Sequence, residues 1–307
     1  MRTIRLDFCD FWPGFRKDQN WFTELLGMRF RVEIHEKPDF LIFANFGETH
    51  RRYTCPRIFF TGEANRHDFR VCDYALTCHY VDDPRHYRLP LYSLFLDPAS
   101  LLKAPDEAER ILAEKSKFCA FVVSNRHSSK RTDFFFKLSR YKAVDSGGRH
   151  LNNIGRQLPD NTAAKREFLR PYKFNIAFEN QSLPGYTTEK LPQAMEARCV
   201  PIYWGSPRVG EEFNPRSFLN HSDFPSDEAL IERILELDRD DAQYLAMLRE
   251  PYFHRNQINE WFDRDKLLDF FEHIFTAPVQ PVGARRSFFS LGVQALDKLE
   301  TWRLGRQ

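Results

Sequence analysis

The chain has 307 residues, of which 42% are hydrophobic and 29% charged, and it contains 30 phenylalanines. This composition is typical of a folded globular protein large enough for two domains, and it excludes a disordered chain. The formal net charge of +2 argues against a dedicated nucleic-acid binder, so any anion-binding site must be local.

The first 115 residues alternate short apolar runs with helical or irregular segments. This pattern predicts a parallel sheet covered by helices. We expect a short helix at 19–26 and strands at 3–8, 40–45, 57–61 and 73–77. Residues 100–116 are typical of a linker followed by a charged helix. We therefore place the domain boundary there and predict an N-terminal domain over 1–115.

A second set of alternating elements follows. The expected strands are 118–123, 142–145, 174–178 and 200–204, and the expected helices are 132–140, 163–170 and 190–198. Two consecutive strand–loop–helix–strand units predict a doubly wound α/β domain over 116–275, in which ligands bind at the carboxyl ends of the strands. Further helices are expected at 228–237 and 242–249.

Residues 276–307 combine a proline-containing linker with a predicted amphipathic helix from 288 to 302, flanked by arginines. Two interpretations stay open: the helix packs back on the N-terminal domain, or it makes a peripheral contact with a membrane. The six cysteines form no Cys-x-x-Cys pair, which predicts free, buried thiols. Neither a secretory signal nor an apolar run of ~18 residues is present. We expect a location in the cytoplasm or at the inner face of the membrane, unless an anchor has been removed.

The segment from Phe174 to Pro207 has the pattern of a strand, a polar loop, a helix and a strand. Pro192 is tolerated only in a first helical turn, so the helix begins near Glu189 and Lys190. A helix N-terminus attracts phosphate, and the Lys190 ammonium is placed to meet a diphosphate. The Glu189 carboxylate suits the two hydroxyl donors of a ribose. The alternative is an ordinary capped helix with a surface Glu–Lys pair.

Three other side chains are candidates for the same site, and Glu63 is a candidate for a separate catalytic position. Asn180 can bond a phosphate or sugar, and Tyr186 can pack on a ring. Arg131, just before the helix expected at 132–140, offers a planar fork for phosphate oxygens, although a solvated loop charge is an equal alternative. Glu63 follows an apolar strand and a glycine, where it could act as a general base. A surface glutamate is the other interpretation.

The chain resembles the α-1,3/4-fucosyltransferase family, particularly its bacterial members. The resemblance lies between residues 57 and 224, in FNIAFENQSLPGYTTEK, VPIYWGSPRVGEEFNPRSFLN, KFCAFVVSNRHSSKR and FFTGEANRHDFRVCDYAL. It implies an α/β fold of the GT-B class, with two Rossmann-like doubly wound domains and the active site in the cleft between them. It also implies that no cofactor is required and that no metal is bound at the site, a divalent metal being at most stimulatory.

The implied function is inverting transfer of L-fucose from GDP-β-L-fucose to a GlcNAc or glucose hydroxyl of an N-acetyllactosamine-like, Lewis-type glycan, by an α-1,3-fucosyltransferase. By the resemblance, Arg131 and Lys190 bind the diphosphate and Glu189 binds the ribose. Asn180 and Tyr186 match positions in the donor loop. Glu63 matches the general base of the family.

The chain also departs from the family. Ala64 stands where relatives often carry asparagine, and the residues before position 50 resemble relatives only loosely. Acceptor identity is therefore the least transferable inference. Phe11 and Trp12 could stack on an acceptor sugar, or could pack in the core. The alternative functions are a GT-B transferase for another sugar nucleotide, or a non-catalytic glycan-binding protein on the same fold.

Overall fold

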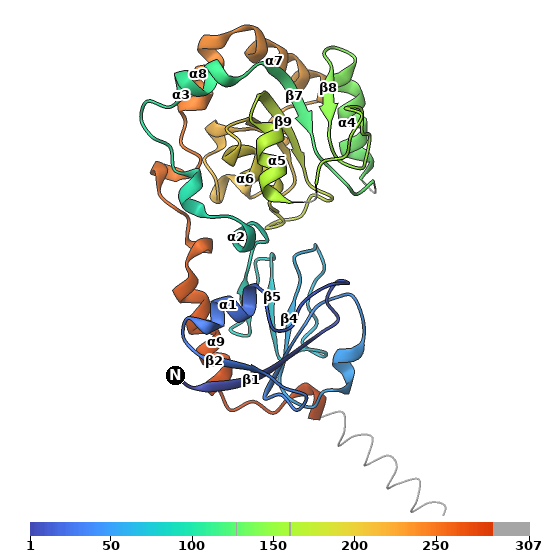
Figure 1. The fold of residues 1–307 in the computed structure, drawn as a ribbon, viewed down its shortest axis with the longest axis vertical. Helices are drawn as coiled ribbons and strands as arrows, with labels where there is room; N and C mark the ends of the chain where they lie inside the picture. The colour runs from blue at the N-terminus through green and yellow to red at the C-terminus, as the bar shows by residue number, and fades with distance from the viewer. Residues whose placement is uncertain (127, 160, 285–307) are drawn as a thin grey trace, which may run out of the picture. The chain divides into compact units, whose positions relative to one another are not determined.

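The computed structural model describes residues 1–126, 128–159 and 161–284 (Figure 1). The helix predicted at 288–302 lies outside these residues. The chain forms two compact units. The N-terminal unit contains Met1–Thr77, Val81–Leu89 and the described residues from Asp263 onward, and the C-terminal unit contains Cys78–Tyr80 and Pro90–Phe262.

The N-terminal unit is built on a fully parallel six-stranded sheet in the order β2-β1-β3-β4-β5-β6. Its strands are β1 Thr3–Cys9, β2 Arg31–Ile34, β3 Phe40–Phe43, β4 Arg57–Phe60, β5 Tyr74–Thr77 and β6 His86–Arg88. The predicted parallel sheet is confirmed. The sequence did not predict β2 and β6, because these edge strands are short and half polar, and lack an apolar run.

Two helices of the N-terminal unit contact each other. Helix α1, Trp21–Gly27, follows Asn20, whose side chain caps its first turn. Helix α9, Arg264–Thr276, packs Phe271 against Phe22, with 6.4 Å between ring centroids. Its exposed side is held by Arg29, which donates to Glu272 at 3.1 Å.

The two units differ from the predicted domains in two places, and the α9 contacts explain one of them. The predicted boundary at 115/116 lies inside the C-terminal unit, which already begins at Pro90. The predicted C-terminal domain over 116–275 includes α9, whereas α9 belongs to the N-terminal unit. Such a return of the chain depends on aromatic contacts between residues more than 240 positions apart, and no local pattern reveals them.

The C-terminal unit has a parallel five-stranded sheet in the order β11-β10-β9-β7-β8. Its strands are β7 Lys117–Phe121, β8 Val144–Ser146, β9 Tyr172–Phe178, β10 Val200–Trp204 and β11 Leu219–Asn220. Its helices are α2 Tyr92–Phe95, α3 Ala108–Glu114, α4 Ser129–Ser139, α5 Thr162–Leu169, α6 Lys190–Glu196, α7 Asp227–Arg239 and α8 Asp241–Arg249. The core under α4, α7 and α8 is a continuous cluster that includes Phe134, Ile176 and Ile231.

Both sheets are doubly wound, as predicted for the second half. In each, the second strand in chain order lies on one side of the first strand and the third lies on the other side. The chain therefore leaves β1 and β3 in opposite directions, and likewise β7 and β9. Crevices at the carboxyl ends of such strand pairs are the usual ligand sites of open α/β sheets. The fold thus marks two positions: β1/β3 and β7/β9.

All six cysteines lie in the described residues and are free thiols. Cys72, Cys78, Cys119 and Cys199 are buried, whereas Cys9 and Cys55 are half-buried. The predicted free thiols are confirmed. Within the described part of the chain, no helix has the length and apolar character needed to cross a membrane.

Asp227, the first residue of α7, holds α4 and α7 together. Its carboxylate accepts from Lys130 at 2.6 Å and Lys137 at 2.8 Å, and His221 Nε2 lies 2.6 Å away. Burial raises the pKa of Asp227, but these partners outweigh it and hold the pKa well below the usual range. Because the pKa of Asp227 is lower in the folded state than its unfolded-state value of about 3.9, the ionised carboxylate stabilises the fold above pH ~3.9. This stability is lost progressively as the pH falls from there towards the folded-state pKa.

We expect Asp227→Asn to lower the free energy of unfolding by about 1–3 kcal/mol at pH 7, because it removes charge-assisted hydrogen bonds. Urea unfolding at pH 7 and pH 3 measures this, and the difference from the native protein should shrink at pH 3. The neighbouring exposed pair of Glu228 and Lys137 provides the control, since Glu228→Gln should cost less than about 1 kcal/mol. An equal cost for both variants, or a cost that does not depend on pH, would refute the role of Asp227.

Candidate functional site

The candidate site of the C-terminal unit lies at the switch point between β7 and β9. After β7 the chain runs through Ser124 and Asn125 into α4, and after β9 it runs through a polar loop, 179–189, into α6. Parallel pairing of β7 with β9 places both loops at the same edge of the sheet. The side chains predicted for donor binding all come from these two segments or from the first turn of the helix that follows each.

Arg131 lies in the first turn of α4, which begins three residues earlier than predicted. Its guanidinium is fully buried. Nη1 donates to Asn180 Oδ1 at 2.8 Å and Nη2 to the Asn125 carbonyl at 2.5 Å, so the structure brings Arg131 and Asn180 together as predicted. The interpretation of Arg131 as a solvated loop charge is wrong, because the helix carries its side chain inward.

The Arg131 cation is incompletely satisfied. Among the described residues, Nε has no hydrogen-bond partner and no carboxylate forms an ion pair with the guanidinium. Burial lowers the pKa of Arg131, and the nearby Glu179 and Tyr186 raise it. An arginine stays charged even when its pKa falls below the ordinary value, since that value exceeds 12. A buried cation with an unused donor therefore suits an anionic ligand.

Glu179 is the central residue of this site that the sequence analysis missed. It directly follows β9 and is fully buried. Its carboxylate accepts the Thr188 backbone N–H at 2.7 Å, the Thr188 hydroxyl at 2.7 Å and the Lys190 ammonium at 3.0 Å. Burial raises the pKa of Glu179 against the lowering effect of Lys190. A carboxylate immediately after a buried strand was the signal available in the sequence.

Lys190 begins α6, as predicted from Pro192. Its ammonium donates to Glu179 Oε2 at 3.0 Å and to Thr188 Oγ1 at 2.8 Å. Two of its three N–H donors are thus used inside the protein. Burial lowers the pKa of Lys190, but Glu179 and Glu189 outweigh this and raise it. Lys190 is accordingly a fixed cation, and the interpretation of Glu189 and Lys190 as an ordinary surface pair is wrong for Lys190.

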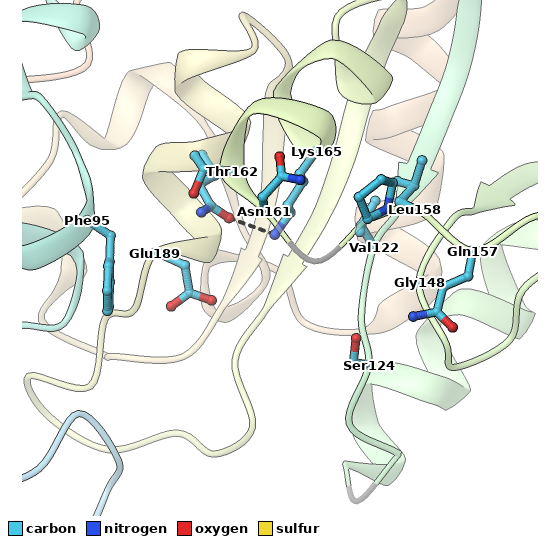
Figure 2. A pocket seen from close by; sticks show the side chains of 12 residues that line it. Phe95, Val122, Ser124, Gly148, Gln157, Leu158, Asn161, Thr162, Lys165 and Glu189 are labelled. Atoms are coloured by element: carbon cyan, nitrogen blue, oxygen red, sulfur yellow. Dashed lines mark hydrogen bonds between the residues drawn. The ribbon is translucent and has the colours of Figure 1, made fainter. Parts of the chain in front are cut away.

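Glu189, whose Oε1 lies 3.6 Å from Lys190 Nζ, lines a cavity of about 250 Å³ (Figure 2). The other lining residues include Phe95 from α2, Ser124 after β7, and Lys165 and Gln193 from α5 and α6. Lys165 Nζ donates to Gln193 Oε1 at 2.8 Å, and both residues line the cavity. Burial raises the pKa of Glu189, but the nearby Lys190 and Lys165 outweigh burial, and the pKa lies below its ordinary value. The carboxylate is therefore ionised and can accept hydrogen bonds.

Tyr186, the remaining donor-loop candidate, is buried and only 2% exposed. It follows Gly185, which has a φ of +87°. Any Cβ at Gly185 would overlap the Cys78 carbonyl oxygen, so the loop requires glycine there. The Tyr186 side chain is thus enclosed by the protein. Its ring does not offer the open face that stacking on a ligand ring requires.

Gly148 forms part of the cavity wall. A Cβ there would overlap the backbone of Val123, including its carbonyl oxygen. We expect Gly148→Ala to lower the free energy of unfolding by about 1–3 kcal/mol, because backbone must shift to relieve the overlap. Gly27→Ala is the control: no heavy atom lies within 4 Å of a Cβ there, and stability should stay within about 1 kcal/mol of native. Equal melting temperatures for both variants would contradict the close approach.

The other candidates belong to the N-terminal unit. Glu63 is exposed, and its backbone N–H donates to the Thr61 hydroxyl at 3.0 Å. Phe11 is half-buried and stacks on Phe15 at 3.9 Å between centroids, which favours core packing over sugar binding. Trp12 is 44% exposed. Among the described residues, no group of three or more His, Cys, Asp or Glu side chains is arranged to hold a metal ion.

Solved structures with this architecture exist. The crystal structure of an α1,3-fucosyltransferase with GDP-fucose aligns over 91% of this chain and 92% of its own, with a TM-score of 0.75 and 28% identity. The structure of HepE from Anabaena with UDP-glucose, at 8% identity and a TM-score of 0.53, shares the fold alone. Two doubly wound α/β units of this kind define the GT-B fold class.

The family follows from the sequence comparisons. Residues 6–95 match the alpha-(1,3)-fucosyltransferase FucT N-terminal domain, and residues 112–264 match the glycosyltransferase family 10 (fucosyltransferase) C-terminal domain. The chain belongs to glycosyltransferase family 10, the fucosyltransferase family. Similar proteins are alpha-(1,3)-fucosyltransferase FucT of Helicobacter pylori, 31% identical over 81% of this chain, and bovine 3-galactosyl-N-acetylglucosaminide 4-alpha-L-fucosyltransferase FUT3, 38% identical over 47%. The chain spans 60% of the Helicobacter pylori protein and 39% of the bovine one.

Proposed function

We propose that this protein is an inverting α-1,3-fucosyltransferase, which moves L-fucose from GDP-β-L-fucose to a GlcNAc or glucose hydroxyl of an N-acetyllactosamine-like glycan. Family membership supports fucosyl transfer as the reaction. The observation that carries the donor assignment is the buried Arg131 guanidinium, which has an unused donor and no carboxylate partner among the described residues. A nucleoside diphosphate supplies the anion that such a site lacks.

The donor would be held by groups of different chemistry. Arg131 and the third N–H of Lys190 would bind diphosphate oxygens. Asn180 would orient the Arg131 guanidinium by accepting a hydrogen bond from Nη1. The ionised Glu189 carboxylate would accept both hydroxyls of the ribose at the cavity. As the bond to fucose breaks, negative charge grows on the departing GDP. Preorganised cations at that position would stabilise this charge.

Glu63 is proposed as the general base. It would take the proton from the acceptor hydroxyl while that oxygen attacks the anomeric carbon on the face opposite GDP, which inverts the configuration there. The exposed carboxylate at the end of a strand, beside Gly62, is consistent with access to an acceptor. Since two cations already meet the charge on GDP, this mechanism requires no metal ion.

A donor and acceptor panel tests the proposal. The native protein is incubated with GDP-fucose, GDP-mannose or UDP-sugars, and with N-acetyllactosamine or lactose as acceptor. We expect turnover with GDP-fucose alone and a product carrying an α1,3-linked fucose by NMR. Turnover with another donor would establish the alternative transferase. GDP or glycan binding without turnover would establish a non-catalytic binding protein.

A further inference from the structure

The N-terminal sheet has its own switch point, between β1 and β3. The segments that leave it are 10–20 after β1 and 44–50 after β3. They are joined by backbone bonds, since Ala44 N–H donates to the Cys9 carbonyl at 3.2 Å and Phe46 N–H to the Asp10 carbonyl at 2.9 Å. In open α/β sheets, ligands usually bind at an edge with this topology.

A buried clamp holds the loop from Asn45 to His50 in place. The Asp10 carboxylate, only 2% exposed, accepts the N–H groups of Thr49 and His50 at 2.9 Å each. His50 Nδ1 lies 2.7 Å from the same carboxylate, and the imidazole stacks on Phe43 at 4.2 Å. Within the described residues, the buried His50 Nε2 has no hydrogen-bond partner.

The clamp also contains backbone strain. Asp10 has a φ of +59°, an uncommon conformation for a residue with a side chain. A Cβ at Gly47 would lie 2.5 Å from Asp10 Oδ1, so only glycine fits. Strain of this kind persists only where the surrounding structure enforces it, and it concentrates at functional sites. The clamp therefore ties the loop after β3 to the segment after β1.

The clamped loop presents an aromatic side chain to solvent. Phe46 is 55% exposed, although its backbone is fixed to Asp10. Trp12, on the other segment, is 44% exposed, and its ring contacts Phe11 and Phe15 edge-on. Scattered exposed hydrophobic residues are common, but two aromatic side chains on the two segments of one switch point are not scattered.

Hydrogen bonds connect this loop to the segment that carries Glu63. Asn45, next to Phe46, accepts the Thr61 hydroxyl at 3.1 Å through Oδ1. The Thr61 hydroxyl oxygen in turn accepts the Glu63 backbone N–H at 3.0 Å. A ligand held by Phe46 would therefore lie in a fixed relation to the loop of the proposed general base.

We propose that Phe46 is a sugar-stacking residue of the acceptor site, with one pyranose ring of the acceptor lying on its face. The polarised C–H groups of a pyranose complement the negative face of an aromatic ring, and a ring carried on a fixed backbone loses less entropy on binding than one on a mobile loop. This inference rests on the proposed function, because the acceptor gives the site its ligand. The Asp10–His50 clamp acts through Phe46 by positioning its loop.

Kinetics with GDP-fucose and N-acetyllactosamine test the inference. We expect Phe46→Ala to raise the KM for the acceptor roughly tenfold, whereas the affinity for GDP, measured by calorimetry, stays native. Phe46→Trp should restore the acceptor KM, and Phe46→Leu, which keeps an apolar side chain without a ring, should not. Phe136→Ala is the matched control, since Phe136 is 50% exposed on α4 and should leave both constants unchanged.

Saturation-transfer NMR with N-acetyllactosamine and GDP separates this inference from the proposed function. We expect transfer to the acceptor ring protons in the native protein and its loss in Phe46→Ala. A native acceptor KM and native transfer in Phe46→Ala would overturn the inference while the proposed function stands. An equal acceptor KM for Phe46→Leu and native protein would also overturn it. If the native protein shows no turnover but saturation transfer to the acceptor is still lost in Phe46→Ala, the proposed function is refuted and the inference about Phe46 stands.

Discussion

Glu63→Gln is expected to lower kcat between about 100- and 10,000-fold, the usual contribution of a general base. The amide has the shape of the carboxylate but cannot accept the proton of the acceptor hydroxyl. The Glu63 side chain is exposed, and substitutions at exposed positions usually change stability by little. The melting temperature and the affinity for GDP should therefore both stay native.

Asp68→Asn provides the matched control for Glu63→Gln. It makes the same carboxylate-to-amide change five residues later, where Asp68 pairs with the exposed Arg70 at 2.9 Å. This variant should keep more than about half of the native kcat, because an exposed ion pair contributes little. Near-native turnover in Glu63→Gln would remove Glu63 from the mechanism. An equal loss in both variants would point to a general effect of charge.

Lys190→Met is expected to have two separable effects. It leaves the buried Glu179 carboxylate without its cation, which should cost about 3–5 kcal/mol of stability. It also removes a cation from the proposed diphosphate site, which should weaken GDP binding roughly 10- to 100-fold. Thermal unfolding measures the first effect and calorimetry with GDP the second.

The double variant Glu179→Gln, Lys190→Met distinguishes these effects. Removing the buried carboxylate together with its partner should restore most of the lost stability, since the amide introduced by Glu179→Gln can still hydrogen-bond Thr188 without an uncompensated charge. GDP affinity should stay low. If the double variant binds GDP like the native protein, Lys190 supports the fold through Glu179 and does not bind phosphate.

Local patterns predicted those parts of the fold that local chemistry controls. Apolar runs such as Phe40–Phe43 and Arg57–Phe60 are buried strands because only a covered parallel sheet accommodates them. The start of α6 follows from Pro192, which lacks an N–H. Strands β2 and β6 escaped prediction because edge strands need no continuous apolar run.

The candidate site also has a part that local sequence predicts and a part that it does not. Lys190, Glu189 and Arg131 were singled out from their residue types at the ends of predicted strands or starts of helices. Their environments were not predictable: Glu179 as the partner of Lys190, Asn180 against Arg131, and the wall formed with Lys165. Hydrogen bonds between segments tens of residues apart depend on strand order, which a local pattern does not contain.

Local sequence accounts for the alternation of strands and helices, the free thiols, the resemblance to fucosyltransferases and the residue types of the donor loop. Each depends on interactions between near neighbours or on the chemistry of single side chains. The tertiary structure alone decided that α9 joins the N-terminal unit, that Arg131 is buried with an unused donor, and that Asp10 clamps the loop of Phe46. These features arise because packing and burial bring distant segments together and exclude water from their charges.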